Sequence, residues 1–188
     1  LNALSYWLYL LGGVVLYASW FSKSGPAASG WTAYVPLSDT HQPGAGQDMW
    51  ILSLHILSLS SLAGAINFIV TIHNMRARGM TWMRMPLFVW TIVTYAWLLV
   101  LVLPTLSAGL TLLLLDRQAG THFFQPGEGG NAVLYQHVFW FFGHPEVYIM
   151  VLPAMGMISE IIPVFARKPI FGYTAIAFST AGIAFYSL

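Results

Sequence analysis

Residues 131–163 read NAVLYQHVFWFFGHPEVYIMVLPAMGMISEIIP, and this stretch decides the fold class. It is mostly apolar and longer than the roughly 20 residues that an α-helix needs to cross a bilayer. A helix satisfies its backbone hydrogen bonds within its own segment, which lipid requires because lipid offers no partners. The stretch therefore predicts a transmembrane helix, one that carries the ionisable side chains His137, His144 and Glu146.

The composition of the 188-residue chain fits lipid as the surrounding solvent. Hydrophobic residues make up 57% of the chain and charged residues 7%, whereas soluble domains carry roughly 25% charged residues. A soluble fold of this composition would expose large apolar patches and aggregate. The net charge of +1 and the lack of a basic patch exclude a nucleic-acid partner. The absence of cysteine excludes disulfides, thiolate metal sites and iron–sulfur clusters.

Four further apolar stretches are near or above the length of a membrane span. They cover about residues 2–21, 49–72, 86–115 and 169–188. We therefore predict an all-α, polytopic transmembrane helix bundle with five spans, in a single membrane domain that covers residues 1–188. Leu1 is not an initiator methionine and the chain stops inside an apolar run, so we expect an internal part of a longer polypeptide.

The connections between the stretches differ in their basic residues. Arg76, Arg78 and Arg84 lie between the second and third stretches, and Arg167 and Lys168 lie between the fourth and fifth. The other two connections carry one basic residue each, together with acidic residues. Because cytoplasmic loops are enriched in Lys and Arg, we predict that the Arg-rich connections face the cytoplasm.

The fourth stretch places several chemically active side chains at helical spacing. His144 and Tyr148 are four residues apart, so they lie on one helix face, and Trp140 extends this face by another turn. Glu146 points elsewhere, because two residues correspond to about 200° around a helix. Pro145 removes a backbone hydrogen bond beside the histidine. An ionisable residue at membrane depth is by default a candidate for function.

Each of these side chains also has a structural interpretation. A lone intramembrane histidine can be an interhelical hydrogen-bonding contact, and a Trp/Tyr stripe is commonly packing. A buried glutamate can belong to an ion pair, but the predicted spans offer no intramembrane Lys or Arg for Glu146. The combination of His, Pro, Glu and Tyr within five residues favours a redox or proton-transfer site.

The second stretch carries a row of small and polar residues. Ser53, Ser60, Gly64 and Asn67 recur at intervals of 7, 4 and 3 along one helical stripe, and Ser61 is adjacent. Such a stripe can line a polar path. It can equally be the small-residue surface that lets two helices approach closely.

The string from Tyr135 to Ile149, YQHVFWFFGHPEVYI, resembles the copper-site helix of the catalytic subunit of haem–copper oxygen reductases of the cytochrome c oxidase type. The resemblance covers essentially the whole chain, in order, and would correspond to about the third to seventh spans of a longer subunit. Further matching strings are Gly64–Phe68, Pro86–Trp90, Leu103-Pro104, Ala108-Gly109, Asp116-Arg117, Leu152-Pro153, Gly156–Ser159 and Phe171–Tyr173.

The resemblance implies roles for four residues of the fourth stretch. His144 corresponds to the first of three histidines that bind copper, for which imidazole is a suitable ligand. Tyr148 corresponds to a tyrosine that is covalently joined to that histidine ring and that supplies an electron and a proton to oxygen chemistry. Trp140 corresponds to a tryptophan packed beside the copper. Glu146 corresponds to a carboxyl group that passes protons to the oxygen site and to a proton pump.

The resemblance also implies a proton path and a set of partners. Ser60, Ser61 and Asn67 correspond to residues that line the water-filled path to the glutamate. The expected cofactors are copper, bound by His144 and by ligands outside this sequence, and two haems, whose iron is bound by histidines outside it. The expected partners are other oxidase subunits, including an electron-entry subunit, with cytochrome c or quinol, O2 and the lipid bilayer.

The function implied is that of a terminal respiratory oxidase, which reduces O2 to water, pumps protons and takes electrons from cytochrome c. The implied location is the bacterial plasma membrane, favoured over the mitochondrial inner membrane. His55, His73, His122 and His137 match no metal ligand of the family, and we assign them to packing, hydrogen bonding or loop surfaces.

Other functions remain open at the level of the sequence. A quinol-oxidising member of the superfamily is one alternative, whereas the arrangement of Glu146 and Tyr148 argues against a nitric oxide reductase. A proton-coupled membrane transporter could use Glu146 and the polar stripe without any metal. A structural membrane subunit would leave the pairing of His144 with Tyr148 unexplained.

Overall fold

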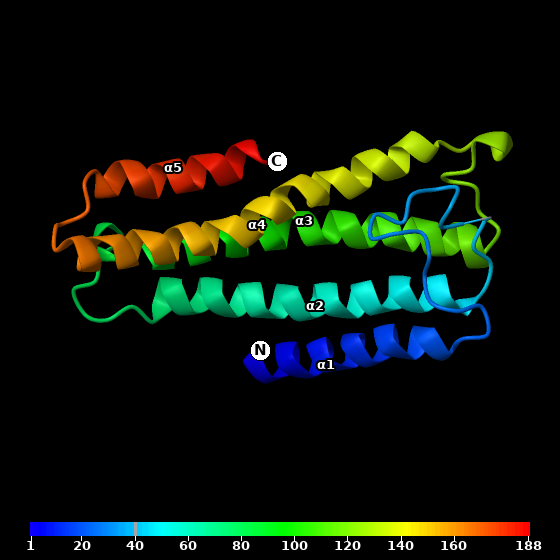
Figure 1. Ribbon diagram of the computed structural model, residues 1–188, viewed down its shortest axis with the longest axis horizontal. Coiled ribbons are helices and arrows are strands. Elements are labelled where there is room, and N and C mark those ends of the chain that lie inside the picture. Colours follow the sequence, from blue (N-terminus) through cyan, green and yellow to red (C-terminus); the bar gives the residue numbers. More distant parts are fainter. Residues whose placement is uncertain (40) are drawn as a thin grey trace. The chain divides into compact units, whose positions relative to one another are not determined.

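The computed structural model describes residues 1–39 and 41–188, and the regular structure in this part of the chain is helical throughout (Figure 1). The five α-helices of this part are α1 (Asn2–Ala18), α2 (Ala45–Asn74), α3 (Leu87–Gln118), α4 (Ala132–Ala166) and α5 (Tyr173–Tyr186). Short 3₁₀ turns lie at η1 (Ser19–Phe21), η2 (Trp82–Arg84) and η3 (Pro126–Glu128). The predicted all-α class is confirmed.

Four of these helices are long and apolar enough to cross a membrane. They are α1 continued through η1 to Phe21, and α2, α3 and α4, and each overlaps a predicted span. The fifth predicted span is also helical, but α5 has 14 residues. At 1.5 Å per residue α5 rises about 21 Å, less than the roughly 30 Å of the hydrocarbon core.

The backbone between α4 and α5 explains where α5 begins. Arg167 has a φ of 52°, a left-handed conformation that ends α4 at Ala166. The N–H of Lys168 then donates a hydrogen bond to the Pro163 carbonyl oxygen at 3.2 Å. Gly172, with a φ of 69°, supplies a second left-handed residue directly before α5, which glycine adopts readily because it has no Cβ. The helix therefore begins at Tyr173 rather than at residue 169.

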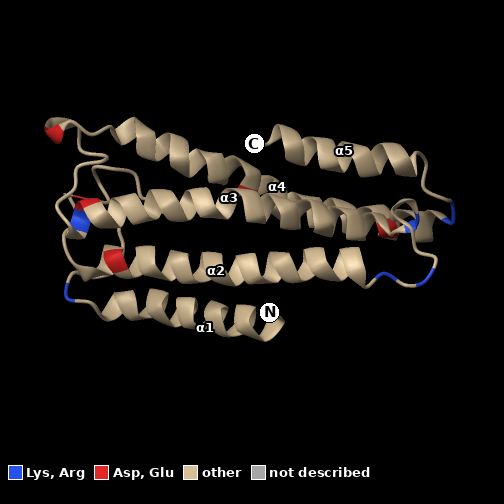
Figure 2. Cartoon of the chain, turned by 180° about the vertical axis from the view of Figure 1, so that it is seen from behind, with Lys and Arg blue, Asp and Glu red and all other residues tan. Residues whose placement is uncertain are grey.

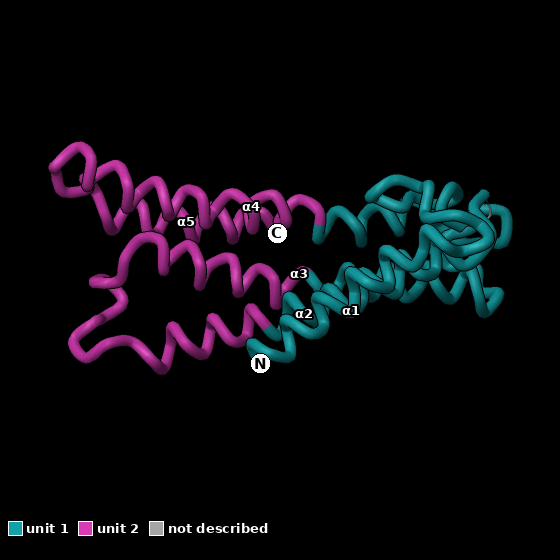
Figure 3. The backbone as a smooth tube through the Cα atoms, turned by 60° about the horizontal axis from the view of Figure 1, so that its bottom comes forward, with its two compact units in different colours: residues 1–63, 103–142 teal, residues 64–102, 143–188 magenta. Residues whose placement is uncertain are grey.

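The chain forms two compact units, which Figure 3 shows in teal and magenta. Unit 1 comprises residues 1–63 and 103–142, and unit 2 comprises residues 64–102 and 143–188. Helices α2, α3 and α4 contribute to both units. The divisions in α3 and α4 fall beside Pro104 and Pro145, where a proline removes a backbone hydrogen bond of the helix. That the whole chain is a single membrane domain stays a prediction.

In unit 1, small and hydroxyl side chains bring α1 against α2. The Ser60 hydroxyl donates to the Ser5 carbonyl oxygen at 2.6 Å, and the Ser5 hydroxyl donates to the Ser60 carbonyl oxygen at 2.9 Å. The Ser53 hydroxyl donates to the Gly12 carbonyl oxygen at 2.9 Å. A Cβ placed on Gly12 would lie 2.8 Å from the Leu57 side chain, which would then have to move. Such contacts drive helix association in lipid.

Unit 2 has a core between α3, α4 and α5. Leu98, Leu152 and Ala184 are buried together, one from each helix. Nearer the start of α3, Gly156 faces the backbone of that helix, and a Cβ placed on it would lie 2.9 Å from the Cα of Phe88. The close contact between α3 and α4 in this unit therefore depends on a glycine.

The charged residues gather in the loops and near the helix ends (Figure 2). Glu160 lies in the last part of α4 and accepts a hydrogen bond from the N–H of Leu87 at 2.6 Å. This bond satisfies a backbone donor at the start of α3. Glu146 is the exception, because it lies near the middle of α4. This distribution is the one expected of membrane-spanning helices, in which a charge at membrane depth is costly.

Candidate functional site

The rings of His144 and Tyr148 lie against each other on α4, within unit 2. Their centroids are 4.9 Å apart and their planes meet at 80°, an edge-to-face arrangement. The spacing of four residues brings the rings together because successive helical turns stack side chains four positions apart. The prediction that the two side chains share a helix face is confirmed. Their roles stay predictions.

The two rings are held by neighbouring groups of unit 2. Nδ1 of His144 lies 3.2 Å from the Ser187 carbonyl oxygen, at the end of α5. The half-buried Tyr148 ring packs against the core formed by Leu98, Leu152 and Ala184. The imidazole therefore has a defined orientation, although its side chain stays exposed.

Glu146 lies between these two residues in sequence and is half-buried. The ion pair found among residues 1–39 and 41–188 joins Arg117 to Asp48, so Glu146 has no cationic partner within this part of the chain. A carboxyl group at membrane depth without a counter-ion is suited to taking up and releasing protons.

Trp140 belongs to unit 1, and its indole is anchored by a loop that the sequence did not single out. Its Nε1–H donates a hydrogen bond to the hydroxyl oxygen of Tyr34, and its ring packs edge-to-face on Trp31, with centroids 5.9 Å apart. Both partners come from the Gly- and Pro-rich segment before α2. No periodic pattern marks such a loop, so sequence reasoning missed Trp31 and Tyr34.

The polar stripe of α2 divides between the two units. Ser60 and Ser61 belong to unit 1, and Asn67 belongs to unit 2. Ser60 is buried and hydrogen-bonded to Ser5 of α1, as Ser53 is to Gly12, which supports the helix-packing interpretation for these two serines. Ser61 is exposed and Asn67 is half-buried. A proton path through Ser60, Ser61 and Asn67 stays a prediction.

The donor set for a metal consists of one imidazole. No group of three or more His, Asp or Glu side chains is close enough to hold a metal ion within residues 1–39 and 41–188. His55, which we assigned to packing, hydrogen bonding or a loop surface, contacts the carbonyl oxygen of Ser107 at 3.2 Å and the hydroxyl of Thr111 at 2.9 Å. A copper ion at His144 would therefore need further ligands from outside these residues.

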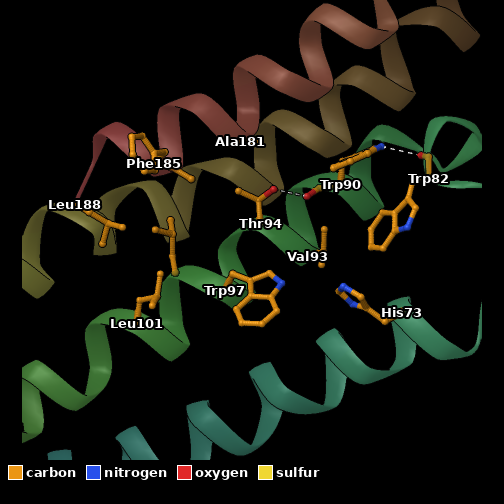
Figure 4. Close-up of a pocket in the computed structure, with 12 residues that line it drawn as sticks. His73, Trp82, Trp90, Val93, Thr94, Trp97, Leu101, Ala181, Phe185 and Leu188 are labelled. Atoms are coloured by element: carbon orange, nitrogen blue, oxygen red, sulfur yellow. Dashed lines mark hydrogen bonds between the residues drawn. The ribbon is translucent and has the colours of Figure 1, made fainter.

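An apolar groove of about 310 Å³ runs along α3 in unit 2 (Figure 4). Trp82, Trp90 and Trp97 line it together with aliphatic side chains of α3 and α5, and His73 is its one ionisable lining residue. The His73 ring packs on Trp82, with centroids 4.9 Å apart. Such a lining suits an apolar occupant and lacks the set of ligands that a metal requires.

Together, the long apolar helices and the His–Tyr pair within one of them define a multi-pass membrane protein with a candidate redox or proton-transfer site. The chain belongs to the family described as cytochrome c and quinol oxidase polypeptide I, whose family model matches residues 1–188. Membership of this family confirms the resemblance found in the sequence.

Individual relatives agree with the family. The chain is 53% identical, over its whole length, to the "probable cytochrome c oxidase subunit 1-beta" of Nocardia farcinica. It is 52% identical over 98% of its length to cytochrome c oxidase subunit 1 of Bacillus subtilis, and 50% identical over 97% to that of Cereibacter sphaeroides. It covers 32%, 29% and 33% of these relatives, so it spans about a third of their length.

Proposed function

We propose that this chain is part of the catalytic subunit of a terminal oxidase that reduces O2 to water. The observation that carries the proposal is the contact between the rings of His144 and Tyr148 in α4, in a chain that belongs to this family over all of residues 1–188. The subunit names of the relatives and the multi-pass character of the chain support it.

His144 would hold copper through its imidazole, and the remaining copper ligands and the histidines for two haems would come from other parts of the subunit. Copper and haem, when bound, supply the redox chemistry that O2 reduction needs. The proximity of the Tyr148 ring supports a covalent link between the two rings. Such a link forms with loss of one hydrogen from each ring, a two-electron oxidation for which O2, the proposed substrate, would be the oxidant. Tyr148 would then deliver a proton and an electron from a fixed position beside the metal.

Glu146 would move protons towards this site. Its place in the middle of α4, without a cationic partner in the described part of the chain, supports the exchange of a proton at its carboxyl oxygens. Ser60, Ser61 and Asn67 would hold water along the path that supplies it. Trp140, anchored by Tyr34, would pack beside the copper. Coupled proton pumping belongs to the same proposal.

The electron donor we propose is cytochrome c, because the relatives are named cytochrome c oxidases. A quinol donor is the alternative, since the family description also includes quinol oxidases. The proposed partners are further oxidase subunits, including the one through which electrons enter. The proposed location is the bacterial plasma membrane, in line with the bacterial relatives.

The test is an optical spectrum and a metal analysis of the purified intact protein. Haem absorbance together with copper is the expected result. A protein that moves protons but contains neither haem nor copper would instead be a proton-coupled transporter that uses Glu146 and the polar stripe of α2. Turnover assays with reduced cytochrome c and with a quinol, run side by side, would identify the donor.

A further inference from the structure

Arg117, at the end of α3, is a buried cation at the centre of an extended contact network in unit 1. Its side chain is 4% exposed, and its Nε donates to an Asp48 carboxylate oxygen at 2.5 Å. Its Nη1 donates to the carbonyl oxygens of Ser38 at 2.6 Å and Gln42 at 2.9 Å, and its Nη2 donates to that of Gly44 at 2.9 Å. The planar fork of five N–H donors in a guanidinium is needed to reach so many acceptors at once.

These carbonyl groups belong to the loop that contacts α4. The N–H of Ser38 donates a hydrogen bond to the Tyr34 carbonyl oxygen at 3.0 Å. Ser38 is therefore hydrogen-bonded both to Arg117 and to Tyr34. The Tyr34 hydroxyl accepts the hydrogen bond from the Trp140 indole, and the Tyr34 ring packs edge-to-face on Phe139. Hydrogen bonds therefore connect Arg117 to Trp140 by way of Ser38 and Tyr34, and all of these residues belong to unit 1.

The same loop makes further contacts with residues 135–140 of α4. The Tyr135 hydroxyl donates to the Thr32 carbonyl oxygen at 3.0 Å. The Trp31 ring packs on Phe139, with centroids 5.3 Å apart, and on Trp140. Residues 31–34 thus contact two successive turns of α4, and Arg117 binds the same loop through its carbonyl oxygens at Ser38, Gln42 and Gly44.

We propose that Arg117 is a positioning residue for Trp140. By binding the loop carbonyls, Arg117 keeps Tyr34 where its hydroxyl meets the indole N–H. Under the proposed function, Arg117 thereby fixes the orientation of Trp140, the side chain that would pack beside the copper. Arg117 itself touches no reacting group.

The test uses the intact oxidase and measures the hydrogen bond of the Trp140 indole. Ultraviolet resonance Raman spectra contain a band that depends on hydrogen bonding of an indole N–H, and subtraction of the spectrum of a Trp140→Phe variant isolates Trp140. Arg117→Lys keeps the charge that faces Asp48 but loses the planar fork. We expect it to shift the band in the same direction as Tyr34→Phe, which removes the acceptor. Arg84→Lys, in the α2–α3 connection of unit 2, is the matched control and should leave the band unchanged.

A double variant separates positioning from a general loss of stability. If Arg117 acts through Tyr34, adding Arg117→Lys to Tyr34→Phe causes no further shift, because contacts within one network are not additive. An unchanged band in Arg117→Lys, or fully additive shifts, overturns the proposal. Should Arg117→Lys not assemble, Asp48→Asn is a milder variant. We expect it to shift the Trp140 band in the same direction, and an unchanged band would likewise overturn the proposal. The band needs neither metal nor turnover, so a protein without copper would refute the proposed function and not this inference.

Discussion

At the scale of single residues, the contact between His144 and Tyr148 follows from helix geometry. Both residues lie in α4, and a separation of four positions places their rings on successive turns of the same face. A neighbouring carboxyl group, Glu146, is directed to another side of the helix because its position is two residues away. One helical segment thus presents the proposed copper ligand and the proposed proton-exchanging group on different faces.

We expect His144→Ala to yield an intact oxidase that is deficient in copper, because the substitution removes an imidazole ligand. Copper measured by elemental analysis, relative to haem, should fall well below that of the parent protein. His137→Ala is a suitable control, since His137 lies on the same helix and its side chain is exposed. Full copper occupancy with unchanged oxygen reduction in His144→Ala would show that this histidine is not a ligand.

Glu146→Gln is expected to leave copper in place and to abolish most proton-coupled turnover. The amide has nearly the same shape but exchanges no proton, and the loss of a proton-transferring group commonly costs about 10² to 10⁴ in rate. Oxygen consumption and proton release from reconstituted vesicles measure the effect. Glu160→Gln is the matched control, because an amide oxygen can still accept the hydrogen bond from Leu87. Normal pumping by Glu146→Gln would remove the role proposed for it.

At the scale of the helices, glycine and serine determine how closely neighbouring elements approach. Ser5 and Ser60 exchange hydrogen bonds between α1 and α2, and Gly156 lets α4 approach α3. These contacts replace the hydrophobic driving force, which is absent between helices in lipid. The Ser60 hydroxyl, which the family resemblance assigns to a proton path, therefore takes part in the contact between α1 and α2.

Gly156→Ala should destabilise unit 2. A Cβ at this position would lie 2.9 Å from the Cα of Phe88, and overpacking of this kind costs about 1–3 kcal/mol. Gly182→Ala is the matched control on α5, because a Cβ there meets no atom within 4 Å. Alanine is also favoured over glycine inside a helix by about 1 kcal/mol.

Thermal unfolding of the two variants in the same detergent provides the comparison. The midpoint should fall for Gly156→Ala and stay equal or rise for Gly182→Ala. Equal midpoints for both variants and the parent protein would mean that α3 and α4 do not depend on this close contact.

At the scale of the whole molecule, the placement of charge predicts the orientation in the membrane. Basic residues dominate the α2–α3 and α4–α5 connections, and the other connections mix basic with acidic residues. Cytoplasmic loops of membrane proteins carry an excess of Lys and Arg. The α2–α3 and α4–α5 connections should therefore face the cytoplasm, and the loops before α2 and α4 should face the opposite side.

Single cysteines introduced into the full-length subunit, after any native cysteine outside these residues is replaced, test this orientation, since residues 1–188 contain no cysteine. A membrane-impermeant thiol reagent applied to intact cells should label Glu128→Cys, in the α3–α4 connection. It should label Arg78→Cys, in the α2–α3 connection, only after the membrane is permeabilised. The reverse pattern would show that the chain is inserted in the opposite direction.

The sequence alone determined the helices, their membrane character and the ring pair on α4. These features are local, because they depend on apolar run length and on the repeat of a single helix, both of which can be read from consecutive residues. The late start of α5 shows the limit of this reasoning. The left-handed backbone of Arg167 and Gly172 sets that boundary, whereas the apolar pattern alone favours an earlier one.

The contacts between distant parts of the chain could be identified only from the folded structure. Arg117 binds a loop more than 70 residues earlier, and Trp140 finds its hydrogen-bond acceptor in Tyr34, 106 positions away. Ser60 likewise finds its partner on α1 across 55 positions. No repeat or spacing in the sequence specifies such pairs, because they form only when folding brings loops and helix faces together and most polar groups there find a partner.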